Sequence, residues 1–376
     1  MIRKLQINNY KSLFDLTLEV GRFNVFIGEN GCGKSNLLEA IALAAAAAAD
    51  KLDHEFLASR GIRVTEPQLM RSAFSDESLI EPIKIGVDFA KLDKVEIYTL
   101  HNDNQAYAKW TRFEGNLSSF ITRKKSPFRL NLTKPYSGKE EYKAYLEHCK
   151  NLANNEDKLK NFIIYSPENT ALRNFYKEGQ IEPLGINGEG LLKLLKVIQS
   201  KSDEQRQEIH ASLQLFDWYD QLEIPKDLSS SEDKVTITDR YLTLAFDQRS
   251  ANEGFLFVLF YIALMVSDDT PKIFAIDNID TSLNPKLCTK LIKELVRLAK
   301  KYDKQVFVTT HNPAILDGID LSDDEQRLLV VSRNKQGHTR YKRITLKDKP
   351  RSSSNEDLKL SDAFLRGYLG GLPKGF

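Results

Sequence analysis

The segment Gly28–Ser35, with the sequence GENGCGKS, combines residue types and a spacing that can bind phosphate. It matches the pattern G-x-x-x-x-G-K-[ST], in which glycines let a loop fold back so that its backbone N–H groups point at phosphate oxygens. The lysine of this pattern reaches the β- and γ-phosphates, and the hydroxyl holds Mg²⁺. We therefore predict that this segment binds ATP and Mg²⁺, through Gly28, Asn30, Gly31, Cys32, Gly33, Lys34, Ser35 and Asn36.

A strand and a helix must flank such a loop, and the sequence predicts both. Phe23–Ile27 is a short continuous apolar run that stops at a glycine, which is typical of a buried strand. Asn36–Ala49 is rich in alanine and leucine and predicts a helix, whose start adds a positive dipole end to the loop. This context favours a nucleotide site over a chance match in a glycine-containing turn.

The rest of the chain predicts an α/β fold. Leu5–Val20 alternates apolar and polar residues like an antiparallel strand pair. In the last third, helix-length and strand-length patterns alternate, which favours a mostly parallel sheet covered on both faces. These elements are the helices Asn252–Val266 and Pro285–Lys301 and the strands Ile273–Ile276, Val306–Thr309, Arg327–Ser332 and Thr339–Leu346.

Five segments are expected along the chain. Residues 1–49 and 236–346 would form the two halves of the ATPase core, and residues 347–376 a C-terminal tail with a short helix at Leu360–Tyr368. Residues 161–235 would form a lobe that is helical and contains the Q-loop region. Residues 50–160 would be an insertion, first β and then helical, with strands at Ile83–Phe89 and Val95–His101 and a charged helix at Lys139–Lys160.

Composition limits the partners and the compartment. The 54 basic and 52 acidic residues give a formal net charge of +2, so overall charge does not indicate a polyanion or an anionic membrane as partner. Cys32, Cys149 and Cys288 show no spacing of a zinc site or disulfide framework. The apolar run Phe255–Val266 is shorter than the roughly 20 residues that span a bilayer. The N-terminus lacks the apolar region of a signal peptide. We expect a cytoplasmic protein with no membrane partner.

Several segments resemble, in order along the chain, the ABC-type ATPases of the RecF, SMC and Old-like class. NNYKSLFDLTLEVGRFNVFIGENGCGKSNLLEAI resembles their opening, in which a short antiparallel pair precedes a P-loop ending in GKSN. SPENTALRN resembles the region after their Q-loop strand, and PLGINGEGLLKLL resembles a segment of small defence-associated members. NEGFLFVLFYIAL, IFAIDNIDTSLNP and FVTTHNPAIL stand where the signature helix, the Walker B motif with the D-loop, and the switch histidine belong. Residues 50–160 match no motif of this class.

The resemblance implies a mechanism. In this class two heads stack head to tail and hold ATP between the P-loop of one and the signature motif of the other, so that ATP stabilises the closed pair. Asp277 would hold Mg²⁺, and His311 would contact the γ-phosphate, although a lone histidine at a strand end can also be structural. Ser282–Pro285 would be the D-loop. The residues that would face the partner's nucleotide are Asn252, Glu253 and Gly254.

The sequence departs from this class at three places. Asn252 replaces the signature serine, unless Ser250 takes its place, and no Q-loop glutamine is identifiable, with Glu168 the nearest candidate. Asn278 replaces the glutamate that activates the attacking water as a general base, a role worth about 10²–10⁴-fold in rate. An amide can orient water but not deprotonate it. We predict slow hydrolysis, with Asn278, Asp280 and His311 as catalytic candidates; the alternative is ordinary hydrolysis through Asp280.

Two basic regions could contact DNA or RNA, or could simply face solvent. They are Arg123, Lys124, Lys125 and Arg129 in the insertion, and Arg333, Lys335, Arg340, Lys342, Arg343, Lys347, Lys349 and Arg351 near the C-terminus. After His311 too little chain follows for the Toprim nuclease that Old-like proteins carry. Any effector is therefore expected on a separate polypeptide.

The expected function is an ATP-binding scaffold or sensor of bacterial antiviral defence, similar to Septu-like ATPases, which assembles with itself and controls a separate nuclease. The closing segment LSDAFLRGYLGGLP also resembles the tails of such proteins. A RecF-like DNA repair ATPase is one alternative, which Asn278 fits poorly. A transporter ATPase subunit is the other, and the lack of an LSGGQ motif argues against it.

Overall fold

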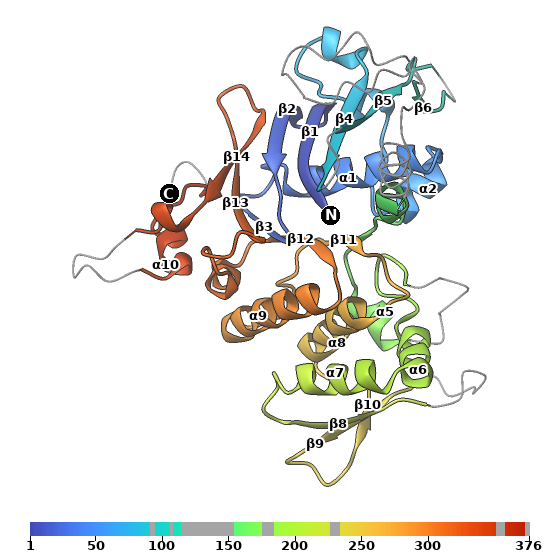
Figure 1. Ribbon diagram of the computed structural model, residues 1–376, viewed down its shortest axis with the longest axis vertical. Helices are drawn as coiled ribbons and strands as arrows, with labels where there is room; N and C mark the ends of the chain where they lie inside the picture. The colour runs from blue at the N-terminus through green and yellow to red at the C-terminus, as the bar shows by residue number, and fades with distance from the viewer. Residues whose placement is uncertain are drawn as a thin grey trace, which may run out of the picture.

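The computed structural model describes residues 1–90, 95–105, 108–113, 154–174, 184–225, 234–350 and 358–372. Its centre is a six-stranded sheet with the order β14-β13-β3-β12-β11-β7 (Figure 1). Neighbouring strands in this sheet run parallel, except that the edge strand β14 is antiparallel to β13. The strands are β3 (Phe23–Ile27), β7 (Ile164–Tyr165), β11 (Ile273–Ile276), β12 (Gln305–Thr310), β13 (Gln326–Arg333) and β14 (Thr339–Ile344). The predicted α/β class and mostly parallel core sheet are confirmed.

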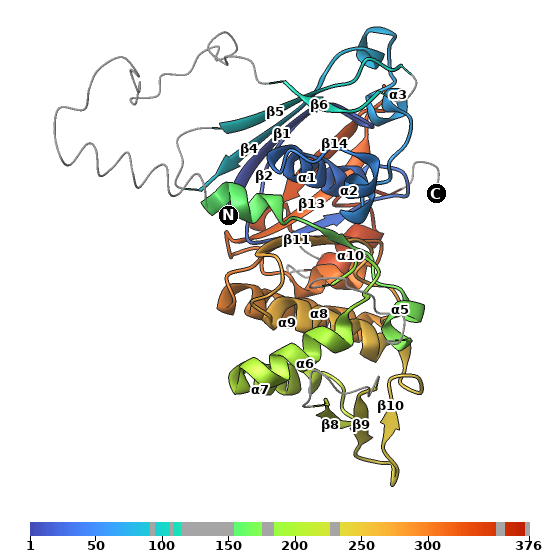
Figure 2. The same ribbon diagram turned by 90° about the vertical axis from the view of Figure 1, so that its right-hand side faces the viewer.

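Helices cover one face of this sheet. Helix α8 is buried along its whole length from Gly254 to Val266, because it lies between the sheet and the other helices of this layer. That position explains why its sequence is apolar all round. Figure 2 shows the layer below the central sheet. Its helices are α5 (Asn169–Arg173), α6 (Leu191–Lys201), α7 (Asp203–Leu213), α8 (Glu253–Val266) and α9 (Pro285–Lys301).

Helix α1 (Lys34–Ala48) lies on the other face, between the central sheet and a second sheet. It contacts β7 and β12 of the central sheet and β1, β4 and β5 of the second. Helices that pack against two sheets at once need short side chains on both sides. The alanine run Ala44–Ala48 supplies these and is buried. This arrangement fixes the direction of the helix that begins at the predicted P-loop.

The second sheet is antiparallel, with the order β2-β1-β4-β5-β6. It confirms the predicted N-terminal strand pair and the two strands of the expected insertion, with bounds as predicted for the latter. Strand β4 pairs directly with β1, so these two strands extend the N-terminal sheet. The strands are β1 (Ile2–Tyr10), β2 (Leu13–Glu19), β4 (Ile83–Phe89), β5 (Val95–His101) and β6 (Thr111–Arg112).

A third, three-stranded sheet spans the boundary between the expected lobe 161–235 and the expected core segment 236–346. Strands β8 (Tyr219–Glu223), β9 (Thr236–Asp239) and β10 (Phe246–Asp247) form it in the order β10-β9-β8. Val235 and Ile237 are buried while the threonines between and beside them are not, an alternation typical of a strand. This sheet was not predicted, because its short alternation lies within a polar stretch.

The remaining elements are short. They are α2 (His54–Ser59), α3 (Pro67–Met70), η1 (Glu77–Leu79), η4 (Pro313–Gly318), η5 (Leu346–Asp348) and α10 (Leu360–Leu365). Of the predicted charged helix 139–160, residues 154–160 are helical and the rest lie outside the described residues. Arg123, Lys124, Lys125, Arg129, Cys149 and Arg351 also lie outside them. No helix within the described parts of the chain is long and apolar enough to cross a bilayer. The division into five segments stays a prediction.

Candidate functional site

The P-loop connects the end of β3 to the start of α1, as predicted. Gly31 and Gly33 have φ angles of 74° and 106°, which favour glycine. A Cβ atom on Gly33 would lie 2.3 Å from Thr339 Oγ1 and 2.7 Å from Ser12 Oγ. Thr339 Oγ1 is itself 2.8 Å from the carbonyl oxygen of Cys32. Gly33 is therefore required both by its backbone conformation and by the close approach of two hydroxyl groups.

The Lys34 side chain folds back into the loop. Its Nζ atom donates to the carbonyl oxygens of Gly28 and Glu29, at 2.9 Å each. Burial lowers the pKa of Lys34, while the carboxylates of Asp277 and Asp280 act in the opposite direction. The ammonium group thus lies in the curve of the loop, where phosphate oxygens would compete with these two carbonyls for it.

Ser35 and Asp277 meet at the carboxyl ends of two parallel strands. Ser35 Oγ lies 2.9 Å from Asp277 Oδ2 and 3.2 Å from Oδ1. The Thr309 hydroxyl also donates to the Asp277 carboxylate. Mg²⁺ bound with nucleotides is held by one or two carboxylates and hydroxyls, by phosphate oxygens and by waters. This oxygen pair fits that requirement, so Ser35 and Asp277 would hold Mg²⁺.

Asn278 adopts a left-handed backbone conformation, with φ of 54°. Its N–H donates to Thr309 Oγ1 at 2.9 Å, and its carbonyl oxygen accepts from the N–H and hydroxyl of Thr281 at 3.1 and 2.8 Å. Asparagine and aspartate tolerate this conformation better than other residues with a side chain. Asparagine therefore suits the backbone of this turn, and its side-chain amide is exposed. A glutamate would be strained in the same conformation.

Asp280 ties the turn after β11 to the end of β12. Its Oδ1 atom accepts from the Thr310 hydroxyl at 2.6 Å and from the His311 N–H at 3.3 Å. The carboxylate thereby fixes the backbone that carries His311. Asp280 therefore links the turn after β11 to Thr310 and to the backbone of His311.

His311 is exposed at the end of β12, close to three charged groups of the site. Burial of part of the ring lowers its pKa, and the Lys34 charge lowers it further, while Asp280 and Asp277 oppose the shift. The lowered pKa favours the neutral imidazole. A neutral ring can donate one N–H to a phosphate oxygen.

Arg63 joins the site, although sequence reasoning did not identify it. Its Nη2 atom donates to Asn36 Oδ1 at 3.0 Å, and its Nε atom pairs with Glu39 Oε1 at 2.5 Å. Glu39 is buried one turn after Ser35 and also pairs with Lys11. The signal was present in the sequence, because a single glutamate within the apolar run of a helix requires a cationic partner.

Asn252 begins α8 as its N-cap, and its Oδ1 accepts from the Phe255 N–H at 2.8 Å. Gly254 lies against the predicted D-loop, because a Cβ atom there would be 3.0 Å from the carbonyl oxygen of Ser282. Glu253 is half-buried in the first turn. The structure thus gathers the P-loop, Asp277, Asp280 and His311 in one place, and it places Asn252, Glu253 and Gly254 beside the D-loop.

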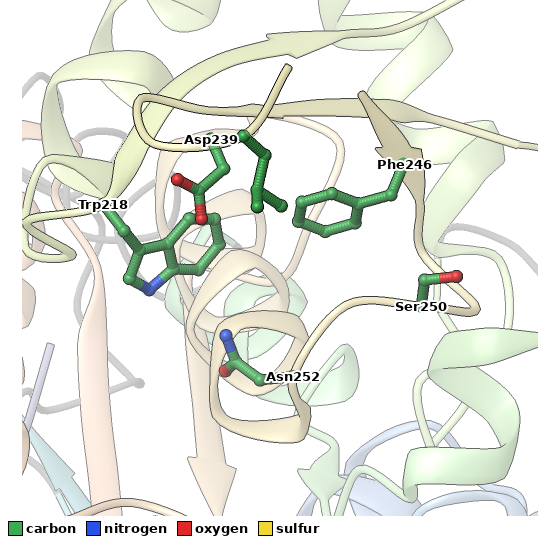
Figure 3. A pocket seen from close by; sticks show the side chains of 6 residues that line it. Trp218, Asp239, Phe246, Ser250 and Asn252 are labelled. Atoms are coloured by element: carbon green, nitrogen blue, oxygen red, sulfur yellow. The ribbon is translucent and has the colours of Figure 1, made fainter. Parts of the chain in front are cut away.

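A hollow of about 430 Å³ opens beside the start of α8 (Figure 3). Ser250 and Asn252 lie at one side of it, and the rings of Trp218 and Phe246 lie at the other. Asp239 and Leu242 complete the lining. The hollow therefore lies between the predicted signature segment and the three-stranded sheet.

Glu168 follows β7 and is exposed at the N-cap of α5. Its N–H donates to the carbonyl oxygen of Asn187 at 2.8 Å, within the segment GINGEG. This segment is held by Glu189, whose carboxylate accepts from the N–H and side-chain amide of Asn187 at 3.1 Å each. The Q-loop role of Glu168 stays a prediction.

The C-terminal basic region is partly neutralised. Lys342 pairs with Asp348 at 3.0 Å, Arg343 pairs with Asp324 at 3.1 Å, and Arg340 donates to the carbonyl oxygen of Asp15 at 2.7 Å. Arg333 and Lys335 are exposed at the loop between β13 and β14. Most of the strand's charges therefore serve contacts within the chain.

Comparisons with known proteins agree with this geometry. An Smc head domain solved with the C-winged helix domain of ScpA is 14% identical, with a TM-score of 0.56 over 92% of this chain and 98% of that one. A second Smc head domain, with an extended coiled coil and the C-terminal domain of ScpA derived from Pyrococcus furiosus, is also 14% identical, with a TM-score of 0.50 over 92% and 96% of the two chains. At this identity the likeness shows a shared fold, that of P-loop ATPase heads. No curated protein matches the sequence.

A family model matches residues 23–317, which include the P-loop, Asp277, Asp280 and His311. Its description is "AAA domain, putative AbiEii toxin, Type IV TA system". The match spans more than half of the chain. The chain belongs to this AAA-domain family.

Proposed function

We propose that this ATPase binds ATP with Mg²⁺, pairs head to tail with a second copy around the nucleotide, and hydrolyses it slowly. Asn278 is the observation that carries the proposal. It stands in the turn directly after the metal-binding aspartate, and its left-handed backbone suits asparagine. The P-loop, Lys34, Ser35 and Asp277 supply the groups that bind phosphate and Mg²⁺, whereas the amide of Asn278 cannot act as a base near pH 7.

Each residue of the site has a role in this account. The P-loop N–H groups and Lys34 bind the phosphates, as in other P-loop proteins. Bound Mg²⁺ neutralises charge on the phosphate oxygens. Asn278 orients the attacking water through its amide, and neutral His311 donates a hydrogen bond to the γ-phosphate. Asp280 holds the backbone of His311 in place through the contacts described above.

Pairing follows from the position of the α8 start. A helix N-terminus attracts phosphate, but the Asn252 side-chain oxygen already caps α8 from within. Asn252 is exposed and lines the hollow beside the start of α8, so its amide nitrogen can donate to a phosphate oxygen of the other copy. Because this contact exists only in the pair, ATP favours the paired state.

Sedimentation of the full chain tests the pairing. We expect monomers without nucleotide and dimers or larger assemblies with ATP and Mg²⁺. Lys34→Ala should stay monomeric because it loses the phosphate contact. Asn252→Ala should still bind ATP but pair more weakly. Wild-type protein that binds ATP and remains a monomer at all concentrations would refute the pairing.

We further propose that the pair holds a separate effector, with a nuclease as the expected partner, in bacterial antiviral defence. Two findings support an attached partner: the matched Smc heads were solved with domains of ScpA, and the family description names a toxin of a toxin–antitoxin system. Purification with the products of neighbouring genes, followed by a nuclease assay with and without ATP, tests this role. Nuclease activity that ignores the ATPase and its nucleotide would contradict it.

A DNA-repair head remains the competing proposal. The exposed Arg333 and Lys335 favour it, because cations at a loop tip can contact phosphates. It requires hydrolysis that DNA stimulates. A turnover rate that does not change with added DNA would leave the scaffold proposal in place.

A further inference from the structure

We propose that the loop between β9 and β10 docks on an aromatic patch beside the P-loop of a second copy of this chain. The inference rests on the head-to-tail pairing proposed above and specifies which surfaces close the pair. Each copy supplies one loop and one patch, so a two-fold pair contains this contact twice.

The loop, which we call the hairpin tip (residues 240–245), exposes large apolar side chains. Tyr241 and Leu244 are 78% and 79% exposed, and Leu242 is 56% exposed. The tip is nonetheless an ordered turn, because Asp239 Oδ1 accepts from the Tyr241 N–H at 2.8 Å and the Arg240 N–H donates to the carbonyl oxygen of Trp218 at 2.9 Å. A fixed cluster of exposed apolar side chains marks an interaction surface.

The hairpin tip is continuous with the segment that faces the partner in the proposed pair. Leu242 lines the hollow of Figure 3 together with Asn252, the N-cap of α8. If Asn252 approaches the nucleotide of a second copy, the rings of Trp218 and Phe246 in the same hollow approach that copy too. The hairpin tip would then contact the surface that adjoins the P-loop of the second copy.

An aromatic patch of Phe14, Phe74 and His338 adjoins the P-loop. The His338 ring lies 4.6 Å from the Phe14 ring and 4.5 Å from the Phe74 ring, measured between centroids. Phe14 and Phe74 are 38% and 39% exposed. Thr339, the residue after His338, contacts the P-loop at Cys32. The patch is thus separated from the phosphate site by a single residue of β14.

Charge and placement match the two surfaces. Arg240 is the only charged residue of the hairpin tip, whereas exposed Asp76 and Glu77 follow Phe74 closely in the sequence. Figure 2 shows α3 and the β9–β10 hairpin on the same side of the molecule, at opposite ends of its long axis. A two-fold axis between them brings the tip of one copy to the α3 end of the other.

Crosslinking between two differently labelled copies tests the contact. Leu244→Cys protein is mixed with Phe74→Cys protein, and a short bismaleimide is added with ATP and Mg²⁺ or without them. We expect a crosslinked heterodimer that depends on ATP and that exceeds the wild-type background from natural cysteines. Leu346→Cys in place of Leu244→Cys is the control and should give only that background.

Pairing affinity supplies a second, independent readout. Leu242→Ser and Leu346→Ser alter leucines that are each 56% exposed, so they are matched in exposure. Leu242→Ser should weaken ATP-dependent pairing at least tenfold without changing ATP binding by the monomer, and Leu346→Ser should change neither. Thermal unfolding confirms that both variants are folded.

The outcomes separate this inference from the proposal on which it rests. If wild type pairs with ATP but the tip variants pair equally well and no crosslink forms, the docking inference is overturned and the pairing stands. If the tip variants lose only the binding of a separate protein, the tip is a site for that protein and the inference is again overturned. If wild type never pairs with ATP, both fail.

Discussion

Ser35 and Asp277, which are 242 residues apart in the sequence, are joined by a hydrogen bond of 2.9 Å between the serine hydroxyl and the carboxylate. The bond exists because β3 and β11 are strands of one parallel sheet whose carboxyl ends meet at the same edge. The same edge carries Asn278 and His311. The site is therefore a consequence of the strand order, and its members can be tested one by one.

Removing the Ser35 hydroxyl should weaken binding of ATP only when Mg²⁺ is present. We expect Ser35→Ala to lose about tenfold in affinity, equivalent to about 1.4 kcal/mol, because the bound Mg²⁺ loses one oxygen ligand. Calorimetric titration with Mg²⁺ and with EDTA measures this. An equal loss in EDTA would show that the serine binds phosphate and not the metal.

Two glycines of the P-loop should differ in their tolerance of a methyl group. Gly33→Ala combines a strained φ with a clash against Thr339, so we expect it to cost about 2–3 kcal/mol of stability and to abolish ATP binding. Gly31→Ala is the matched control, because its Cβ atom would meet nothing within 4 Å and only the strain of about 1 kcal/mol applies. Chemical denaturation of both variants measures the difference. Equal costs would contradict the role assigned to the Thr339 contact.

The buried Glu39 should matter more for stability than its exposed partner. Glu39→Gln leaves Lys11 without its counter-charge in a site where the Glu39 side chain is 2% exposed, and we expect a loss of about 3 kcal/mol. Arg63→Ala removes a side chain that is 64% exposed and should cost about 0–1 kcal/mol. Urea unfolding compares the two. A larger loss of stability for Arg63→Ala than for Glu39→Gln would contradict the claim that the buried carboxylate matters more.

His311 should titrate below its usual range in the nucleotide-free protein. Partial burial and the Lys34 charge lower its pKa, so the unfolded chain binds more protons between that lowered pKa and 6.5, and stability falls as pH falls through this window. Lys34→Ala should raise the His311 pKa, and Asp280→Asn should lower it further. NMR titration of the imidazole checks both shifts. If neither variant changes the His311 pKa, the imidazole does not interact electrostatically with Lys34 and Asp280.

The sequence predicted the core elements closely where the pattern was regular. The bounds of β3, β11 and α9 agree with the structure, because each is a continuous apolar run or a strong helical period between glycine, proline or polar residues. The three-stranded sheet was missed, because β9 and β10 are only two to four residues long and lie in a polar stretch. Nor could the alternation of β4 reveal that β1 is its partner, since pairing depends on the fold of the whole chain.

The candidate site was predicted in the same uneven way. Gly28–Ser35 and Asp277 follow from motifs, and the structure brings them together as expected. Arg63 was missed because it lies in an irregular loop and reaches the site through contacts with Asn36 and Glu39 that depend on the fold. The left-handed backbone of Asn278 could not be predicted either. It determines which carboxylate, aspartate or glutamate, can be introduced at this position without backbone strain.

The rate of ATP hydrolysis by wild type and by Asn278→Asp tests the central claim most directly. Aspartate supplies a carboxylate and tolerates the φ of 54°, whereas Asn278→Glu adds a longer carboxylate together with backbone strain. We predict that Asn278→Asp turns over ATP roughly 10²-fold faster than wild type, since a general base contributes about that factor or more. Asn278→Glu should be faster than wild type to a smaller degree. Equal rates for wild type and Asn278→Asp, with hydrolysis lost in Asp280→Asn, would contradict the slow-turnover account and assign the base to Asp280.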